Sequence, residues 1–338
     1  MSRPASWRRS VVAAGLVASL LGPADTARAD YELGRGLTLF DGRLTIGGYL
    51  ALEAEFLDQT PDRLLIDDLS TFITFRITDR WLLFTEMEAE DPVHVDGGGV
   101  GSGHDVFSLE RLYSEWQDGE HFRLRVGKML TPIGIWNLIH AQPLVWTTSR
   151  PIATEQFFDT GVTGLEATVF APLGTAELAV TAFGQATRQL DDDHDAQETR
   201  RGFGARVELT PQGGPRVGAS FIRFRDHDDH RTETTVGADA IWSLRLVELS
   251  SEVAADIPDS GETTWGAYLQ AVVHAGWRLH PLVRLEYADL GSFDRVPVVV
   301  GIAWKPTDAV VFKLEGIVGG DDTTLEGDGI LTSFSVLF

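Results

Sequence analysis

Apolar and polar residues alternate along most of this chain, in segments of roughly ten residues separated by turn residues. In the segment 44–56, for example, Glu53 and Glu55 share one face of an extended chain, whereas Leu50 and Leu52 share the other. A period of two is the signature of a strand whose two faces meet different surroundings. Repeated along the chain, it predicts strands that turn one face to water and the other to lipid.

We expect sixteen such strands. They cover residues 44–56, 64–78, 81–90, 107–117, 122–130, 161–170, 176–185, 202–210, 216–225, 232–242, 246–255, 263–274, 278–288, 296–304, 310–318 and 330–338. An even number lets an antiparallel sheet close on itself, and closure leaves no unpaired strand edge in hydrocarbon. The predicted fold is therefore an all-β transmembrane antiparallel barrel.

The connections between these segments alternate in length. Short turns occur near residues 79, 118, 211, 243, 275 and 305, and the connections between them are longer and often acidic. Short turns are typical of the periplasmic end of a barrel and long loops of the external end. The alternative, a secreted β-sandwich or jelly roll, explains neither this alternation nor Phe338 on the predicted lipid face.

Two segments depart from simple alternation. The parity of 107–117 is ambiguous, and 216–225 changes parity midway. We interpret the second as a β-bulge, which inserts one residue and shifts the faces of the strand.

The first 29 residues have the pattern of a secretory signal. Arg3, Arg8 and Arg9 precede a short apolar core, and Ala27 to Ala29 form a small-x-small cleavage site. We expect a cleaved signal peptide at 1–29, a periplasmic segment at 30–43 and the barrel at 44–338. Removing four basic residues and one acidic residue from the 28 basic and 50 acidic residues of the chain changes its formal charge from −22 to −25.

The composition narrows the function further. The chain has no cysteine, so disulfides and thiol-bound metals are excluded. No run of 18 apolar residues predicts a helical membrane span. An exported, acidic chain of this pattern is expected in the outer membrane of a Gram-negative bacterium, in contact with lipid and lipopolysaccharide, and nucleic acid is not expected as a partner.

The connection after residue 130 is unusual in length and composition. It runs from Leu130 to Gln156, whereas ordinary connections have about 4–6 residues. It is also apolar, with Trp136, Leu144 and Trp146 among its side chains. We expect it to fold into the lumen and narrow it, with an external loop packed on its neighbours as the alternative.

A barrel of sixteen strands is too wide for its side chains to fill, so it predicts an aqueous channel for small hydrophilic solutes or ions. Inward parity assigns acidic side chains to the lumen at Glu53, Glu55, Glu86, Glu88, Glu90, Glu166, Glu177, Glu233, Asp239, Glu248 and Glu252. The basic ones are Arg76, Arg123, Arg125, Arg206, Arg284 and Lys313. The acidic excess favours a mild cation preference. Alternatively, these charges pair with one another and only set a transverse field.

The sharpest local feature is the face that Glu86, Glu88 and Glu90 share, which Arg123, Arg125 and Lys128 are expected to oppose across the loop. The candidate lining and constriction residues are Glu53, Glu55, Arg76, Glu86, Glu88, Glu90, Arg123, Arg125, Lys128, Trp136, His140, Arg206 and Arg284.

Two connections are dense in Asp and His, and these side chains can hold a divalent cation. The candidate ligands are Asp191, Asp193, His194, Asp226, His227, Asp229 and His230. Neither connection matches a calcium-loop motif. Both are also explained as solvated loops that divalent cations bridge to lipopolysaccharide, and no other cofactor is expected. A barrel that captures substrates or metals is therefore an alternative function.

No enzyme signature is present. The chain lacks G-x-S-x-G and H-E-x-x-H, and no spacing singles out a catalytic triad. An outer-membrane hydrolase that assembles its site from separate strands stays as a further alternative, and we expect no enzyme.

The segment RVGKMLTPIGIWN at 125–137, with His140, Pro143 and residues 146–151, resembles the phosphate- and polyphosphate-selective porin superfamily. The preceding ERLYSEW at 110–116 is also similar to that family, and the similarity covers about 107–151. The resemblance implies a sixteen-stranded porin, commonly trimeric, whose third external loop folds inward. The anion-selective members line the pore with arginine ladders and a lysine cluster. The acidic lining predicted here differs, so phosphate selectivity is not carried over.

Overall fold

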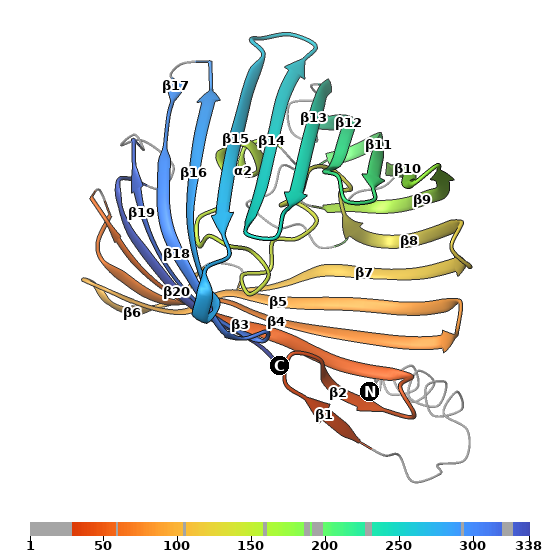
Figure 1. Ribbon diagram of the computed structural model, residues 1–338, viewed down its shortest axis with the longest axis horizontal. Coiled ribbons are helices and arrows are strands. Elements are labelled where there is room, and N and C mark those ends of the chain that lie inside the picture. The colour runs from red at the N-terminus through yellow and green to blue at the C-terminus, as the bar shows by residue number, and fades with distance from the viewer. Residues whose placement is uncertain are drawn as a thin grey trace, which may run out of the picture.

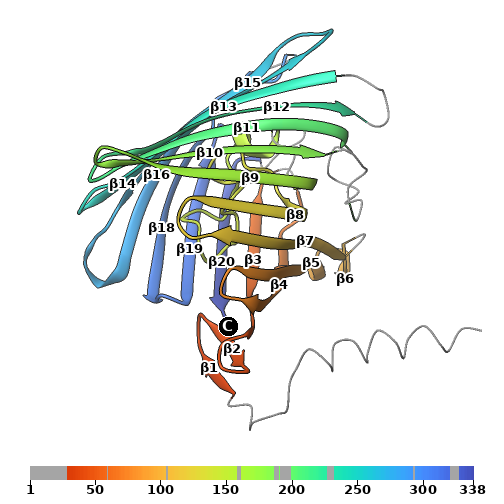
Figure 2. The ribbon, with the colours of Figure 1, turned by 90° about the vertical axis from the view of Figure 1, so that its right-hand side faces the viewer.

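The computed structural model describes residues 29–58, 60–103, 106–157, 161–185, 190, 199–226, 232–291, 294–319 and 327–338. They form a closed antiparallel β-barrel (Figures 1 and 2). Its sixteen wall strands are β3 (Leu44–Leu57), β4 (Arg63–Thr78), β5 (Trp81–Asp96), β7 (Phe107–Asp118), β8 (Phe122–Leu130), β9 (Gly161–Leu173), β10 (Ala176–Gln185), β11 (Thr199–Pro211), β12 (Arg216–Asp226), β13 (Thr232–Ser243), β14 (Val247–Pro258), β15 (Thr264–Val273), β16 (Leu279–Asp289), β18 (Val298–Thr307), β19 (Val310–Val318) and β20 (Gly329–Leu337).

The last strand closes the sheet against the first. β20 pairs with β3 from Gly329 opposite Leu57 to Leu337 opposite Tyr49. Beyond that ladder, Phe338 exchanges two backbone hydrogen bonds with Gly48, at 2.9 and 3.0 Å. The predicted barrel and its number of strands are confirmed.

Short elements extend the wall at its ends. β1 (Asp30–Glu32) and β2 (Gly36–Leu39) form a hairpin, and β2 adds to the start of β3. This hairpin projects beside the C-terminus (Figures 1 and 2) and lies within the N-terminal segment 30–43. β6 (Gly99–Gly101) pairs antiparallel with the end of β5, and β17 (Asp294–Arg295) pairs in the same way with the end of β16. η1 (Gly276–Arg278) is a 3₁₀ turn before β16.

The two faces of the wall differ as the alternation predicts. Large apolar side chains such as Leu83, Met87 and Leu269 are exposed on the outer face. Buried polar and charged side chains, including Glu86 and Arg284, occupy inward positions. No helix in the described ranges is long and apolar enough to span a bilayer.

The predicted bulge in β12 is wrong. β12 pairs with β13 without a register shift from Arg216 to Arg225. The parity changes because the inward residues Ile222 and Phe224 are apolar, and they are buried against an apolar segment inside the barrel. β7 does contain a bulge, because its register against β5 shifts between Glu86 and Glu88. This extra residue explains the ambiguous parity of 107–117.

Candidate functional site

The connection between β8 and β9 lies inside the barrel (Figure 1). It begins at Thr131 and includes one helical turn, α2 (Ile152–Glu155), and its residues 158–160 lie outside the described ranges. Pro132 and Pro151 cannot donate to a ladder, and Gly134 has a φ of +63°, so the segment leaves the strand conformation. Without a ladder, its backbone N–H groups need other acceptors.

Three glutamates of the barrel wall supply these acceptors. Glu252 of β14 accepts from the backbone N–H groups of Ile135 at 2.9 Å and Trp136 at 3.2 Å. Glu315 of β19 accepts from two consecutive amides, Thr148 at 3.0 Å and Ser149 at 2.7 Å. In the third contact, the carboxylate of Glu286 on β16 accepts from the N–H of Ile152 at 2.8 Å. Hydrogen bonds to a carboxylate are shorter and stronger than neutral ones, so these contacts anchor the loop.

Two basic side chains of the same wall bind the loop's oxygen atoms. Arg284 donates to the Thr147 hydroxyl at 2.7 Å and to the Ser149 carbonyl at 2.9 Å. Lys313 Nζ donates to the Gln142 carbonyl at 2.7 Å and to the Thr147 carbonyl at 2.9 Å. Because donors and acceptors of the wall both find partners, the loop is attached to β14, β16 and β19 along its length.

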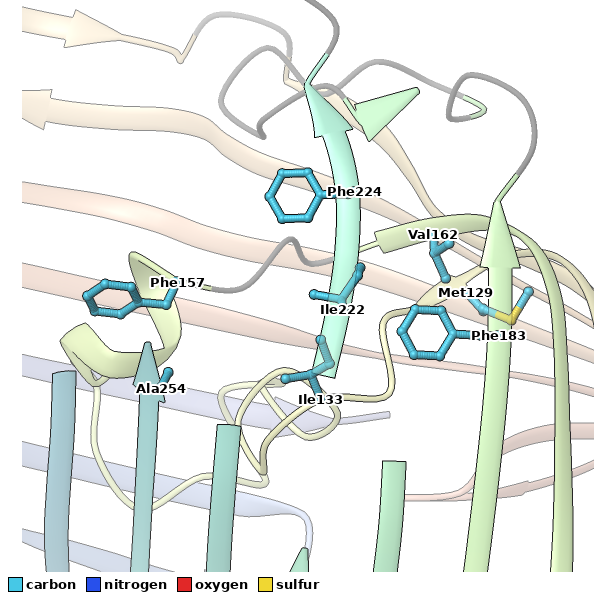
Figure 3. Close-up of a cluster of buried hydrophobic side chains, with 8 residues drawn as sticks. All are labelled: Met129, Ile133, Phe157, Val162, Phe183, Ile222, Phe224 and Ala254. Carbon is cyan, nitrogen blue, oxygen red and sulfur yellow. The ribbon is translucent and has the colours of Figure 1, made fainter. Parts of the chain in front are cut away.

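An apolar cluster fills the space between the loop and the neighbouring wall (Figure 3). It contains Met129, Ile133, Phe157, Val162, Phe183, Ile222, Phe224 and Ala254. A second cluster packs Trp136, Val145 and Ala153 on Tyr268 of β15. Trp136 is therefore buried against the wall and does not face open lumen. Both clusters exclude water from the β10–β15 side of the loop.

The loop also reaches the end of the barrel that carries the short turns. Trp146 Nε1 donates to Glu248 near the start of β14 at 2.6 Å. Its ring lies 4.7 Å from His280 at the start of β16, and Lys305 Nζ lies 4.2 Å from the ring centroid. The loop thus extends from the long-loop end of β8 to the opposite end of the barrel.

The wall from β5 to β9 carries a row of ion pairs. Glu86 of β5 pairs with Arg111 of β7. Arg125 of β8 pairs with Glu115 at 2.7 Å and lies 3.4 Å from Glu166, which Arg123 also approaches at 3.4 Å. The expected opposition of Arg123 and Arg125 to the Glu86 face is therefore wrong, because both arginines bind carboxylates of adjacent strands.

The remaining acidic candidates and Arg76 occupy different surroundings. Glu53 is buried, Glu55 is half-buried, and Glu90 and Arg76 are exposed. Glu88 accepts a hydrogen bond from the Tyr49 hydroxyl at 3.0 Å.

Three basic candidates also differ from one another. Arg206 binds Asp239 through two contacts, at 2.5 and 2.8 Å, and Arg284 anchors the loop as described above. Lys128 alternates with Met129 of the inner cluster and pairs with Leu112 and Thr163. Lys128 keeps only 4% of its surface exposed, so it is buried and does not border open lumen.

His140 connects the loop to the ion-pair wall. Its Nε2 lies 3.8 Å from a carboxylate oxygen of Glu110 on β7. Burial, together with the positive charges of the nearby Arg150 and Arg111, lowers the pKa of His140 to about 3. The imidazole is therefore neutral at neutral pH and contributes no charge.

Sequence reasoning missed Arg111 and Glu115, because the bulge in β7 hides their inward parity. It also missed the anchoring roles of Glu252, Glu286 and Glu315, whose inward positions follow from alternation but whose loop partners do not.

The metal candidates lie outside the described residues. They are Asp191, Asp193, His194, His227, Asp229, His230 and the side chain of Asp226. Within the described ranges, no group of three or more potential ligands gathers.

No family model matches the chain, and no curated protein matches it significantly in sequence. Solved structures do match its fold. Salmonella typhi OmpF in complex with daunomycin aligns with a TM-score of 0.63 and 8% identity, over 87% of this chain and 97% of that one. An anion-selective porin from Comamonas acidovorans gives 0.58 and 13%, over 87% and 98%. The outer membrane channel DcaP of Acinetobacter baumannii gives 0.55 and 10%, over 90% and 99%. At these identities the likeness establishes the porin fold alone.

Proposed function

We propose that this chain is an outer-membrane channel for the passive diffusion of small hydrophilic solutes, narrowed by the loop that Glu252, Glu286 and Glu315 anchor. A closed barrel with an apolar outer face belongs in the outer membrane of a Gram-negative bacterium. The observation that carries the proposal is the asymmetry of the interior. The loop is sealed against β14–β19, whereas charged side chains remain accessible on the β5–β9 wall.

The accessible side is defined by three arginines. The side chains of Arg111, Arg123 and Arg125 keep 24%, 28% and 23% of their surface exposed, although all three point into the barrel. Solvent inside a barrel that is closed to lipid implies a water-filled path along this wall. Solutes would pass between the ion-pair row and the loop.

The ion pairs bear on selectivity. Because Arg111, Arg123 and Arg125 each contact a glutamate, they do not form a free anion-attracting ladder. Glu90 on the same wall is exposed, and the inward set contains more acids than bases. We infer a mild cation preference together with a transverse field that orients dipolar solutes. The resemblance of 107–151 to phosphate-selective porins supports distant kinship, and we do not extend phosphate selectivity to this chain.

Two further expectations belong to the same proposal. The expectation of a homotrimer is based on the resemblance of 107–151 to the porin superfamily. Cross-linking of the protein in native membranes tests this expectation. Cation bridges between the two Asp- and His-rich loops and lipopolysaccharide rest on their composition. Replacing the acids and histidines of both loops by Ser should abolish divalent binding in calorimetric titration.

Planar-bilayer recording of the purified protein tests the channel. We expect stepwise ion conductance, and a reversal potential in a KCl gradient that indicates cation preference. Absence of conductance would contradict the channel, whereas an anion-selective reversal potential would contradict only the interpretation of the lining. An accompanying assay for hydrolysis of ester and phospholipid substrates separates the channel from an enzyme.

A further inference from the structure

Aromatic rings line the same wall as the ion pairs. Phe72 of β4, Phe84 of β5 and Tyr113 of β7 form a continuous row, with centroids 6.2 Å apart between the first two rings and 5.2 Å between the last two. Tyr49 of β3 backs this row at 5.8 Å from Phe72 and is itself fully buried. We name the three half-buried rings, Phe72, Phe84 and Tyr113, the aromatic row.

Guanidinium groups hold these rings in place. Arg111 Cζ lies 4.9 Å from the Phe84 centroid and 5.9 Å from that of Phe72. Arg125 Cζ lies 4.9 Å from the Tyr113 centroid. Stacked cations and rings restrict each other's rotamers, so the row is a preformed surface.

The charges along the row are already compensated. Arg111 contacts Glu86, and Arg125 contacts both Glu115 and Glu166. A charged solute at the row would therefore lie as close to a side chain of like charge as to one of opposite charge. Each pair nevertheless offers guanidinium N–H donors beside carboxylate acceptors, which is the arrangement that two neighbouring hydroxyl groups match.

The loop adds apolar surface within the barrel. Ile139 and Leu144 keep 42% and 52% of their surface exposed, and Ile139 precedes His140, which approaches Glu110 on β7. Large exposed apolar side chains in a water-filled lumen indicate contact with a solute that has an apolar face.

From these features we propose that the aromatic row binds neutral saccharides. The apolar face of a pyranose ring would pack against the surface of Phe72, Phe84 and Tyr113 that the two guanidinium groups leave exposed. Its hydroxyl groups would exchange hydrogen bonds with the Arg111–Glu86 and Arg125–Glu115 pairs. The inference rests on the proposed channel, because sugars would reach the row through its lumen. An aromatic carboxylate could also stack on the rings, but the compensated arginines disfavour its charge.

Sugar-dependent block of ion current tests the proposal. Maltose is titrated against the purified protein in a planar bilayer, and each current is divided by the sugar-free current of the same protein. We expect saturable block by maltose and weaker block by benzoate. The Phe84→Leu variant keeps apolar volume but loses the ring, so its half-blocking concentration should rise about 2- to 10-fold. Phe312→Leu is the control, because Phe312 contacts the rings of Trp304 and Phe334 on the outer face, and it should match the wild type.

Calorimetric titration of maltose into detergent-solubilised protein gives a second readout that needs no conductance. Current without maltose block or binding heat would overturn the saccharide proposal and leave the channel intact. Binding heat without any current would overturn the channel and leave the saccharide site. Stronger block by benzoate than by maltose, or an equal shift in Phe84→Leu and Phe312→Leu, would also overturn the assignment.

Discussion

Replacing Glu315 by Gln should loosen the loop inside the barrel. The carboxylate of Glu315 accepts from Thr148 N–H through one oxygen and from Ser149 N–H through the other. A Gln amide of the same shape keeps one acceptor and presents an NH₂ group to the second N–H. One charge-assisted hydrogen bond is lost, and a buried donor is left without a partner.

A hydrogen bond to a charged group contributes about 1.5–3 kcal/mol, so we expect the free energy of local loop opening to fall by about 2–3 kcal/mol. This corresponds to a loss of about 30- to 150-fold in amide protection. Lys313 adds to the effect, because its ammonium group is buried beside the same loop and loses a nearby negative charge.

Hydrogen exchange followed by mass spectrometry measures this change on peptides that cover 142–150. Glu177→Gln serves as the matched control, because Glu177 is an exposed acidic residue of β10. Peptides from β14–β16 should keep their protection, since the barrel ladder is intact. If protection of 142–150 in Glu315→Gln stays within about twofold of the control, the anchoring role of Glu315 is refuted.

Three further changes probe other contacts. Because the pKa of His140 is lowered in the closed loop, the opened loop binds more protons than the closed one between about pH 6.5 and 3. The free energy of loop opening should therefore fall on acidification, by about 1–2 kcal/mol at pH 5, and stay constant above pH 7. Hydrogen exchange at pH 5 and 7.5 checks this, and His140→Asn should remove the difference. Arg111→Gln leaves the buried Glu86 without its cation, so we expect the free energy of unfolding to fall by about 3 kcal/mol and the reversal potential to become more cation-selective. An unchanged melting temperature would contradict the pairing. Gly164→Ala places a Cβ against the Gly184 carbonyl of β10, so the folded, heat-modifiable band on a gel should decrease. Gly97→Ala, in a turn with open space around it and no positive φ, should cause a smaller decrease, and equal decreases would show that the close approach is not limiting.

The strands were predictable because the membrane imposes two simple constraints. One face of each strand must be apolar, and every backbone group must be paired, so alternation and an even number of segments lead to the closed barrel. The failures occurred where another contact overrides alternation. In β12, Ile222 and Phe224 face inward because the loop covers them, and in β7 a bulge conceals Arg111.

The fate of the segment 130–156 illustrates the limit for the candidate site. Its length and apolar composition predict that it packs inside, and it does. Its attachment points, however, lie on β14, β16 and β19, and sequence analysis assigned the charges there only to the lumen in general. For the same reason Arg123 and Arg125 were inward as expected but had partners other than those expected.

By itself, the sequence determined the barrel, its strand order and most of the residues that turn inward, because these follow from local alternation and from the pairing of successive strands. The tertiary structure alone decided which partners the inward charges contact. Glu315 and Ser149 are 166 positions apart, and Ile135 and Glu252 are 117 apart. Such pairs come together only when the wall has closed and the loop has folded into it, so no pattern along the chain encodes their distance.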